Sequence, residues 1–484
     1  MTTQLTTRTP VIEVLDTPDL GDRSYIVGLD GVAVVVDPQR DIERVLAVLQ
    51  RRDWGVSHVV ETHVHNDYVS GGLELARLTG ATYVVPRGHD YAFDAAIMGD
   101  GDEFDAGAMH WRVVHTPGHT PHHVSYALDV DGRNIAVFTG GSLLYGSVGR
   151  PDLISAAATK GLAHDQWRSV RRLVTELDAD AAVFPTHGFG SFCSATATVG
   201  LESTIGLQAA TNPAALLDED EFVTELIAGL DAFPAYYKHM GPANEAGARA
   251  IDLTPAEHAD PDVLRARIEA GEWVVDLRSR KVWAAEHLKG SLSFDADGNA
   301  ITYLGWLIPW GTPITLLGAS QDQITEFQRA MVRIGIDRPA GQNVGDPGSW
   351  ARSTADLGSI RREDFVGLAA ALAADPNLIV MDARRLTEWR DGHVAGARHV
   401  PLHELPGRIG DVVAWSQAAA HAGADTTVWV SCGSGFRAAV AGSLLARAGV
   451  PVVIVDDDFA NAEKAGLPIV VDGHAATLGA AYSD

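Results

Sequence analysis

Short apolar runs separated by glycine and aspartate turns open the chain and predict a β-layer. Runs at 11–15, 24–28 and 32–37 are typical of antiparallel strands, and an amphipathic helix is expected at 42–51. A buried strand at 56–60 precedes a helix at 72–80, and a long helix is expected at 162–177. Further strands are expected at 83–86, 109–115, 123–129, 136–139 and 181–185. This order predicts a sandwich of two sheets with helices outside.

The pattern of predicted helices and strands changes near residue 250. An acidic helical stretch at 212–230 and an aromatic, proline-marked segment at 233–242 are expected to form a bridge out of the first domain. Beyond it, helices are expected at 264–271, 323–334, 365–374 and 437–448, and strands at 273–277, 314–317, 378–382, 427–431 and 452–455. Strands that alternate with helices at this spacing predict small parallel α/β domains.

The second of these small domains repeats the first. Residues 274–278 read Val-Val-Asp-Leu-Arg and match residues 380–384, which read Val-Met-Asp-Ala-Arg. Each segment is followed by a tryptophan, then an acidic residue and a histidine, then a glycine. We interpret the pair as a tandem duplication. The predicted domains are 1–250, 251–355 and 356–484, so the expected fold class is multidomain, α+β followed by α/β.

The composition limits the partners and the compartment. The 484 residues include 37 basic and 63 acidic ones, and the net charge of −26 argues against nucleic acid and an anionic membrane as partners. The two cysteines, Cys193 and Cys432, exclude a disulfide framework and favour a reducing compartment. No stretch approaches about 18 uninterrupted apolar residues, so no membrane span is expected. We expect a cytoplasmic protein that forms a homo-oligomer.

Potential metal ligands are most concentrated directly after the predicted strand at 56–60. His63, His65 and Asp67 fall within five positions, and strand geometry places the two histidines on one side of the chain. His119 follows in a Pro-Gly-His turn, and His187 follows the predicted strand at 181–185. Four imidazoles and a carboxylate at one edge of a sandwich suit a site for iron or zinc. The simpler alternative is a polar loop with solvated histidines.

Residues 11–210 resemble the metallo-β-lactamase superfamily. The first motif of that family, His-x-His-x-Asp-His, appears at 63–68 with Tyr68 in the last position, and its later histidines appear as His119 and His187. Within the superfamily the sequence looks most like the persulfide dioxygenases, which are often fused to sulfurtransferase domains. The resemblance implies an αββα sandwich, one Fe(II), and oxidation of a glutathione-type persulfide by O2 to sulfite and the thiol. It also implies His63 and His119 as two of three iron ligands.

The third ligand of that family does not carry over, because Gly141 stands where the family has an aspartate. Three outcomes are open at this point. His63, His65 and His119 form a three-histidine site, or another group moves in, or the domain is a binding scaffold without a metal. The candidates for that other group are Asp67, His122, His187 and Asp152. A hydrolase of the glyoxalase type needs two metal ions. This chain lacks the ligands that such a site would need at position 68 and position 141.

A second constellation lies near the C-terminus, between a predicted strand and a predicted helix. Backbone N–H groups and the start of the helix concentrate positive partial charge there, which favours a nucleophilic thiolate and then a persulfide at Cys432. Arg437 either anchors an anionic donor or braces the loop. The cradle for the persulfide is expected to consist of Gly433, Ser434, Gly435 and Phe436.

This loop, within residues 359–471, resembles the active loop of rhodanese sulfurtransferases, which implies thiosulfate as a donor and sulfite as a product. A phosphatase of the Cys-x5-Arg type would need one more residue between Cys432 and Arg437. The earlier repeat reads Leu-Leu-Gly-Ala-Ser at 316–320 and is interpreted as a rhodanese-like domain without the catalytic cysteine.

The sequence therefore predicts a metallo-β-lactamase sandwich followed by two rhodanese-like α/β domains. The expected function is metal-dependent oxidation of a low-molecular-weight persulfide, coupled to sulfane-sulfur transfer through Cys432. Two alternatives remain at this point. One is a sulfur carrier whose first domain is catalytically degenerate, and the other is a metallo-hydrolase of the glyoxalase type.

Overall fold

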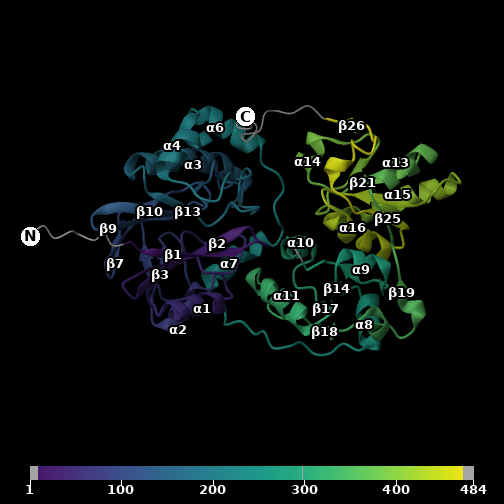
Figure 1. The fold of residues 1–484 in the computed structure, drawn as a ribbon, viewed down its shortest axis with the longest axis horizontal. Coiled ribbons are helices and arrows are strands. Elements are labelled where there is room, and N and C mark those ends of the chain that lie inside the picture. The colour runs from purple at the N-terminus through teal and green to yellow at the C-terminus, as the bar shows by residue number, and fades with distance from the viewer. Residues whose placement is uncertain (1–8, 297, 472–484) are drawn as a thin grey trace, which may run out of the picture. The chain divides into compact units, whose positions relative to one another are not determined.

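The computed structural model describes residues 9–296 and 298–471. The chain divides into two compact units, each of which is described by itself (Figure 1). The first unit holds the described chain up to Ile251 together with Val332–Gly335, and the second holds Asp252–Met331 and the described chain from Ile336 onward.

Two sheets form the centre of the first unit. The first sheet has six strands in sequence order, and its opening strands pair antiparallel as the sequence predicts. These strands are β1 (Val11–Thr17), β2 (Asp22–Leu29), β3 (Val32–Val36), β4 (Gly55–Val60), β5 (Thr82–Pro86) and β6 (Ala96–Met98). The second sheet has the order β13 (Ala182–Pro185), β10 (Arg133–Gly140), β9 (Val124–Val130), β8 (Met109–His115) and β7 (Glu103–Ala106). A small pair, β11 (Leu143–Leu144) and β12 (Ser147–Val148), follows β10.

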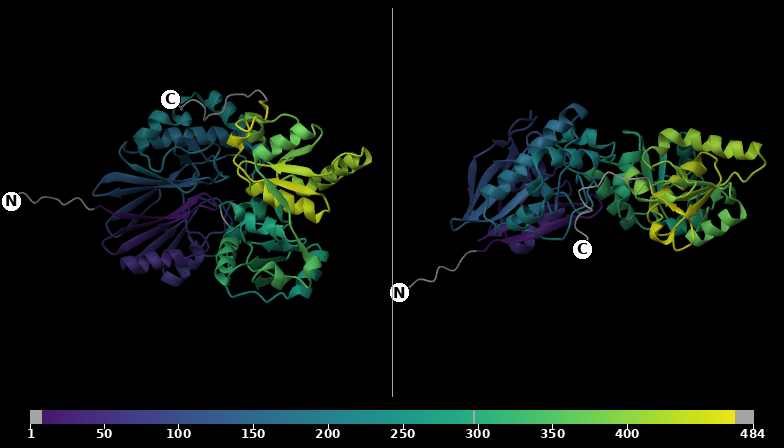
Figure 2. Two further views of the ribbon diagram at one scale, coloured as in Figure 1. Left: turned by 45° about the vertical axis from the view of Figure 1, so that its right-hand side comes forward. Right: turned by 90° about the horizontal axis from the view of Figure 1, so that it is seen from above.

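Helices cover the outer faces of both sheets, which confirms the predicted αββα sandwich (Figures 1 and 2). On β2, Tyr25 and Val27 point into the core between the sheets, while Ile26 points to the helices on the other face. The alternation follows from the two-residue period of a strand that is buried on both faces. The helices of this unit are α1 (Glu43–Arg52), α2 (Gly72–Thr79), α3 (Ala156–Glu176), α4 (Ile205–Thr211), α5 (Pro213–Leu216), α6 (Glu219–Ala228) and α7 (Tyr237–Ala246).

The second unit contains two parallel sheets. The first has the order β16 (Leu292–Ser293), β14 (Trp273–Asp276), β17 (Ile314–Gly318) and β18 (Gly341–Val344). The second has the order β20 (Arg361–Glu363), β25 (Val452–Val455), β24 (Val428–Ser431), β21 (Ile379–Asp382) and β23 (Arg398–His399). Two short antiparallel pairs complete the strands, β15 (His287–Leu288) with β19 (Leu357–Gly358) and β22 (His393–Val394) with β26 (Ile469–Val470). The helices are α8 (Pro261–Glu269), α9 (Arg280–Ala285), α10 (Ala300–Leu307), α11 (Gln321–Arg333), α12 (Pro347–Trp350), α13 (Phe365–Ala374), α14 (Leu386–Asp391), α15 (Leu405–His421) and α16 (Phe436–Arg447).

Both halves of this unit carry the repeated sequence in the same geometry. Arg278 makes a bidentate ion pair with Asp276, and Arg384 makes the same pair with Asp382. The following tryptophan also stacks on the following histidine in both halves, Trp283 on His287 and Trp389 on His393. These shared contacts are what a tandem duplication produces.

Several helices lie where the hydrophobic pattern predicts none, among them α10, α15 and α7. All eight residues of α10 are buried, so its sequence shows no polar face. In α15 the buried residues are only Leu405, Val412 and Ser416, which is too sparse a pattern to indicate a helix. The segment at 233–242, predicted as a bridge without an assigned helix, contains the start of α7, which continues through an internal Pro242.

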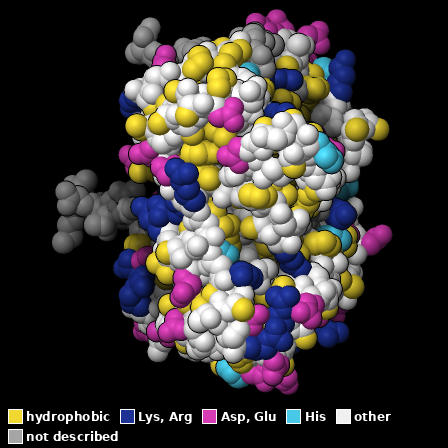
Figure 3. Space-filling view, turned by 90° about the vertical axis from the view of Figure 1, so that its right-hand side faces the viewer, with side chains coloured by type: hydrophobic (Ala, Val, Ile, Leu, Met, Phe, Trp, Pro, Cys, Tyr) yellow, Lys and Arg dark blue, Asp and Glu magenta, His cyan; other side chains and the backbone are white. Residues whose placement is uncertain are grey.

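Acidic and basic side chains lie interspersed on the face shown in Figure 3, so the acidic excess is not gathered into one patch there. Among the helices of the described chain, none is both long enough and apolar enough to cross a membrane.

Candidate functional site

The loops at one edge of the sandwich gather the five residues that the sequence singles out as metal ligands. The loop after β4 carries His63, His65 and Asp67, the loop between β8 and β9 carries His119, and the segment after β13 carries His187. All five side chains are buried, with at most 1% of each residue exposed. A solvated polar loop, the simpler alternative, does not describe these histidines.

Three of the histidines converge on one point. One potential ligand atom from each of His63, His119 and His187 lies within 4.8 Å of the other two. The Nε2 atoms of His63 and His187 are 3.2 Å apart, and the Nε2 atom of His119 is buried without a hydrogen-bond partner in the described chain. Buried polar nitrogens are rarely left unpaired, so this donor set fits a metal ion.

Hydrogen bonds on the far side of two imidazoles leave their Nε2 atoms facing the centre. The Nδ1–H of His119 donates to the backbone carbonyl of Arg150 at 2.9 Å. The Nδ1–H of His187 donates to the carboxylate of Asp22 at 2.9 Å. Metal-binding histidines show this arrangement, because an acceptor on one nitrogen fixes the ring and leaves a lone pair on the other.

The Nδ1 atom of His63 is also engaged, in this case by the hydroxyl of Thr62. The hydroxyl of Thr62 donates to the Asp37 carboxylate at 2.8 Å, so its oxygen accepts from the Nδ1–H of His63 at 2.9 Å. The Nε2 atom of His63 then carries the lone pair, as a metal ligand requires.

The pKa values of the three rings differ in direction. Burial, followed by the nearby His65, lowers the pKa of His63 well below its usual value, and burial lowers the pKa of His119 to about 3. Burial alone would also lower the pKa of His187, but the carboxylates of Asp67 and Asp22 outweigh it and raise this pKa well above its usual value. Burial therefore favours the neutral, metal-binding form of two rings, whereas the two carboxylates favour the charged form of the third.

His65 and Asp67 lie beside this point, and His65 makes different contacts. Its Nε2 atom lies 3.3 Å from the carboxylates of both Asp37 and Glu61, and the Tyr68 hydroxyl is 3.0 Å away. Its Nδ1 atom is buried and unpaired in the described chain, and one ligand atom of His65 lies within 4.8 Å of those of Asp67 and His187. Asp67 lies 3.2 Å from Nδ1 of His187. The geometry thus favours His187 over His65 as the third member of the converging set.

Gly141 has no room for the aspartate that the resemblance leads one to expect. A Cβ atom at this position would lie 2.3 Å from Cδ2 and 2.9 Å from Nε2 of His119. The backbone N–H of Gly141 donates to Nε2 of His123 at 2.9 Å, which fixes the chain there. The His119 ring therefore occupies the space into which a side chain at position 141 would grow.

Two of the other groups weighed as replacement ligands lie elsewhere. The ring of His122 packs against His89, with ring centroids 5.0 Å apart. Asp152 accepts two hydrogen bonds from Arg150, at 2.7 and 2.8 Å.

Cys193 is fully buried, and burial together with Asp67 and Asp22 raises the pKa of its thiol well above the usual value. That environment fits a packed thiol rather than a nucleophile.

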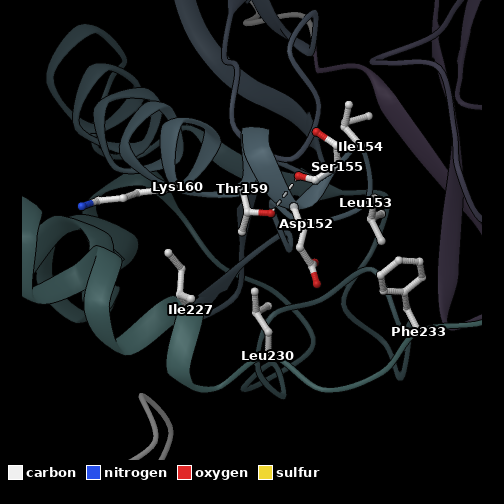
Figure 4. Close-up of a pocket in the computed structure, with 10 residues that line it drawn as sticks. Asp152, Leu153, Ile154, Ser155, Thr159, Lys160, Ile227, Leu230 and Phe233 are labelled. Atoms are coloured by element: carbon white, nitrogen blue, oxygen red, sulfur yellow. Dashed lines mark hydrogen bonds between the residues drawn. The ribbon is translucent and has the colours of Figure 1, made fainter.

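A pocket of about 670 Å³ opens in the same unit, on the side of Asp152 (Figure 4). It lies between the start of α3 and the end of α6, and the ring of Phe233 forms one wall. Arg150 connects this wall to the histidines, because its guanidinium lies 4.8 Å from the centre of the Phe233 ring and its carbonyl holds His119.

The Cys432 loop follows β24 and ends at the first turn of α16, as predicted. Cys432 is buried, and its sulfur accepts a hydrogen bond from the backbone N–H of Gly435 at 3.1 Å. Gly435 has a φ of +94°, a conformation that suits glycine and turns its N–H back toward the sulfur. A backbone N–H aimed at the sulfur is suited to hold a persulfide there.

Arg437 braces this loop through Glu388. Its guanidinium makes a bidentate ion pair with the Glu388 carboxylate, with N···O distances of 2.5 and 2.6 Å. Of the two roles that the sequence left open for Arg437, the geometry shows the bracing contact. Glu388 was not among the predicted site residues, although it belongs to the repeated segment before His393.

The pH dependence of this pair has a defined sign. Burial alone would raise the pKa of Glu388, but Arg437 outweighs it and lowers the pKa from 4.5 to about 2. The stabilisation is therefore complete above pH 4.5 and is lost as the pH falls toward 2. We expect Glu388→Gln to lower the unfolding free energy at pH 7 by about 2 kcal/mol, and the difference from wild type to vanish near pH 2.

Urea unfolding at pH 7, 4 and 2.5 measures this difference. Glu404→Gln is a matched control, since Glu404 is exposed and pairs with Arg408 on the surface, and its effect should stay within about 0.5 kcal/mol. A Glu388→Gln deficit that persists undiminished at pH 2.5 would rule out the ion pair as its cause.

The corresponding loop of the earlier repeat fills its own cradle. Asp276 lies opposite Leu317 in the sheet as Asp382 lies opposite Ser431, so Gly318 takes the place of Cys432. The side-chain oxygen of Gln323 accepts from the backbone N–H of Ala319 at 2.9 Å. A side-chain oxygen of the same segment thus already engages one backbone N–H of this loop.

Two family models match parts of the chain. Residues 19–187 match the metallo-beta-lactamase superfamily, and residues 366–465 match the rhodanese-like domain. A hydroxyacylglutathione hydrolase of Methylococcus capsulatus is 35% identical over 186 residues, which cover 37% of this chain and 67% of that protein. The Homo sapiens protein named Persulfide dioxygenase ETHE1, mitochondrial, is 30% identical over 206 residues, which cover 42% of this chain and 72% of that protein.

A solved structure extends the similarity into the second unit. The crystal structure of a metallo-beta-lactamase from Staphylococcus aureus subsp. aureus COL is 25% identical and covers 70% of this chain and 100% of that one, with a TM-score of 0.63. The matched segments span 58% to 72% of the length of five relatives at the sequence level, four named hydroxyacylglutathione hydrolase and one named persulfide dioxygenase.

Proposed function

Because the chain belongs to the metallo-beta-lactamase superfamily and carries a rhodanese-like domain, we propose that it is an enzyme of sulfur metabolism. In this proposal the first domain oxidises a low-molecular-weight, glutathione-type persulfide with O2 at one metal ion. The Cys432 domain moves sulfane sulfur between that pool and thiosulfate. The observation that carries the metal site is the convergence of three imidazoles whose other nitrogens are all engaged.

His63, His119 and His187 would hold the ion, with Asp67 and His65 beside them. When bound, Fe(II) would supply the one-electron chemistry that O2 requires, which Zn(II) does not. The chain contributes orientation, through Thr62, Arg150 and Asp22 on the far sides of the rings. It also keeps the three rings out of water, since each is at most 1% exposed.

Cys432 supplies the transfer step. Its thiolate attacks the outer sulfur of thiosulfate, the S–S bond breaks, and sulfite leaves with the bonding electrons. An acceptor thiolate or cyanide then takes the sulfane sulfur, and the Cys432 thiolate is restored. The N–H of Gly435 and the bracing of Arg437 by Glu388 hold the loop in the form that this exchange requires.

A hydrolase is the second candidate, because relatives of this chain carry the name hydroxyacylglutathione hydrolase. Against it stand Tyr68, whose hydroxyl is already engaged with the Asp37 carbonyl and His65, and Gly141, which has no donor. A two-ion hydrolytic site would lack ligands at both positions.

Oxygen uptake on glutathione persulfide separates these candidates. We expect anaerobically Fe(II)-loaded wild type to consume O2 and form sulfite, and the double variant His63→Ala, His119→Ala to do neither. Oxygen uptake that persists in the double variant would contradict the proposal that oxidation occurs at this site. Hydrolysis of a glutathione thioester by the zinc-loaded protein, without oxygen uptake by the iron-loaded one, would favour the hydrolase instead.

A further inference from the structure

The repeat that lacks the catalytic cysteine reaches into the Cys432 loop. Arg280, the first residue of α9, donates from Nη2 to the backbone carbonyl of Ser434 at 3.3 Å. Its Nε donates to the carboxylate of Asp456 at 2.8 Å. Both contacts lie inside the second unit, and they join the two halves of the duplication at the active loop.

Asp456 also contacts Gly435, the residue whose N–H binds the Cys432 sulfur. Its carboxylate packs directly against the backbone of Gly435, where a Cβ atom would lie 2.1 Å from Asp456 Oδ1. Arg362 holds the other carboxylate oxygen at 2.9 Å, so two guanidinium groups fix this side chain, which is 2% exposed. The N–H of Gly435 in turn donates to the Cys432 sulfur. The position of that N–H therefore depends on Asp456, and Asp456 is held in part by the other repeat.

Arg280 has no counterpart in the repeat that carries Cys432. The spacing that aligns Asp276 with Asp382 and Trp283 with Trp389 places Leu386 at the position of Arg280. The arginine is therefore not part of the pattern that the two repeats share.

A second contact crosses at the same loop. The ring of Tyr303, from α10, lies 5.8 Å from the ring of Phe436, at the start of α16. Helix α16 also packs against β16 and α9 of the earlier repeat. The cysteine-free repeat thus contacts the loop at Ser434 and Phe436, on either side of Gly435.

We propose that the cysteine-free repeat is a working half of the sulfur-transfer site, and that Arg280 is its positioning residue, which holds the Cys432 cradle through Ser434 and Asp456. The inference rests on the proposed sulfur transfer at Cys432. It adds that one repeat keeps the chemistry while the other, whose own cradle is filled by Gln323, keeps the support.

The test is the alkylation rate of Cys432 as a function of pH, with iodoacetamide and the labelled peptide identified by mass spectrometry. We expect Arg280→Gln to slow alkylation at pH 7 roughly tenfold and to shift the rate profile to higher pH, because a charged hydrogen bond and a nearby cation are lost. Arg280→Lys keeps the charge and should fall between the two. Arg265→Gln removes a half-buried arginine of the same repeat, whose ion-pair partner Glu269 is exposed, and should match wild type.

The same variants are assayed for thiocyanate formation from thiosulfate and cyanide. We expect kcat/KM for Arg280→Gln to fall roughly tenfold, while thermal melts show that the second unit of this variant is still folded at the assay temperature. Asp456→Asn should reproduce the alkylation profile of Arg280→Gln. An unchanged profile in both variants would overturn the positioning role. Wild type that alkylates normally but transfers no sulfur would instead refute the proposed transfer reaction, so the two failures are distinguishable.

Discussion

Serine in place of Cys432 is expected to reduce thiocyanate formation from thiosulfate and cyanide to the level of the buffer blank. The reaction needs a sulfur nucleophile that accepts a second sulfur and gives it up again, and a serine hydroxyl does neither at neutral pH. The loop should keep its shape, since the Gly435 N–H that now donates to sulfur finds an oxygen acceptor in its place. The loss should therefore appear in kcat, without a change in unfolding free energy beyond about 1 kcal/mol.

Cys193→Ser is the matched control for this substitution, because it changes the other cysteine of the sequence and lies in the first unit. We expect it to retain transfer at the wild-type rate. Transfer that persists in Cys432→Ser and disappears in Cys193→Ser would reverse the assignment of the nucleophile.

Aspartate in place of Gly141 is expected to damage the first domain rather than to restore a lost ligand. The new Cβ atom would lie 2.3 Å from the His119 ring, which is fully buried and held by the Arg150 carbonyl. Either the ring or the backbone at position 141 must move, and a carboxylate is buried as well. We expect a loss of roughly 3 kcal/mol of unfolding free energy and weaker binding of Fe(II).

Gly161→Asp is the control for that variant. Gly161 lies on the exposed side of α3, and a Cβ atom there meets nothing within 4 Å. Its unfolding free energy should stay within about 0.5 kcal/mol of wild type. Equilibrium unfolding and Fe(II) titration of both variants provide the comparison. A Gly141→Asp protein that is as stable as wild type and binds Fe(II) more tightly would contradict this prediction. It would show that the His119 ring can move to accommodate a side chain at position 141.

The sandwich and the residues of its site could be predicted because both are local in sequence. Strand β4 is a short valine-rich segment, and His63, His65 and Asp67 follow within its terminal loop. The Cys432 loop is likewise marked by a strand, a cysteine, two glycines and a helix in succession. In each case the chemistry lies where a strand ends, and the hydrophobic pattern shows where that is.

The choice between His65 and His187 could not be made from the sequence. It depends on Glu61 and Asp37, which take the Nε2 face of His65, and on Asp22, which holds the Nδ1 face of His187 from far away in the chain. Spacing does not show which ring nitrogen is already engaged. Arg280 was missed for a related reason, since its partners Ser434 and Asp456 lie in the other repeat.

Metal per chain, measured by elemental mass spectrometry, tests most directly whether the three converging histidines hold a metal ion. Wild type purified without chelator should hold close to one iron per chain, and His63→Ala should hold none, because the site then keeps only two of the three imidazoles. Zinc at the same level would retain the site but move the proposed activity toward hydrolysis. No metal in either protein, even after anaerobic addition of Fe(II), would contradict the metal site and leave Cys432 as the centre of the chemistry.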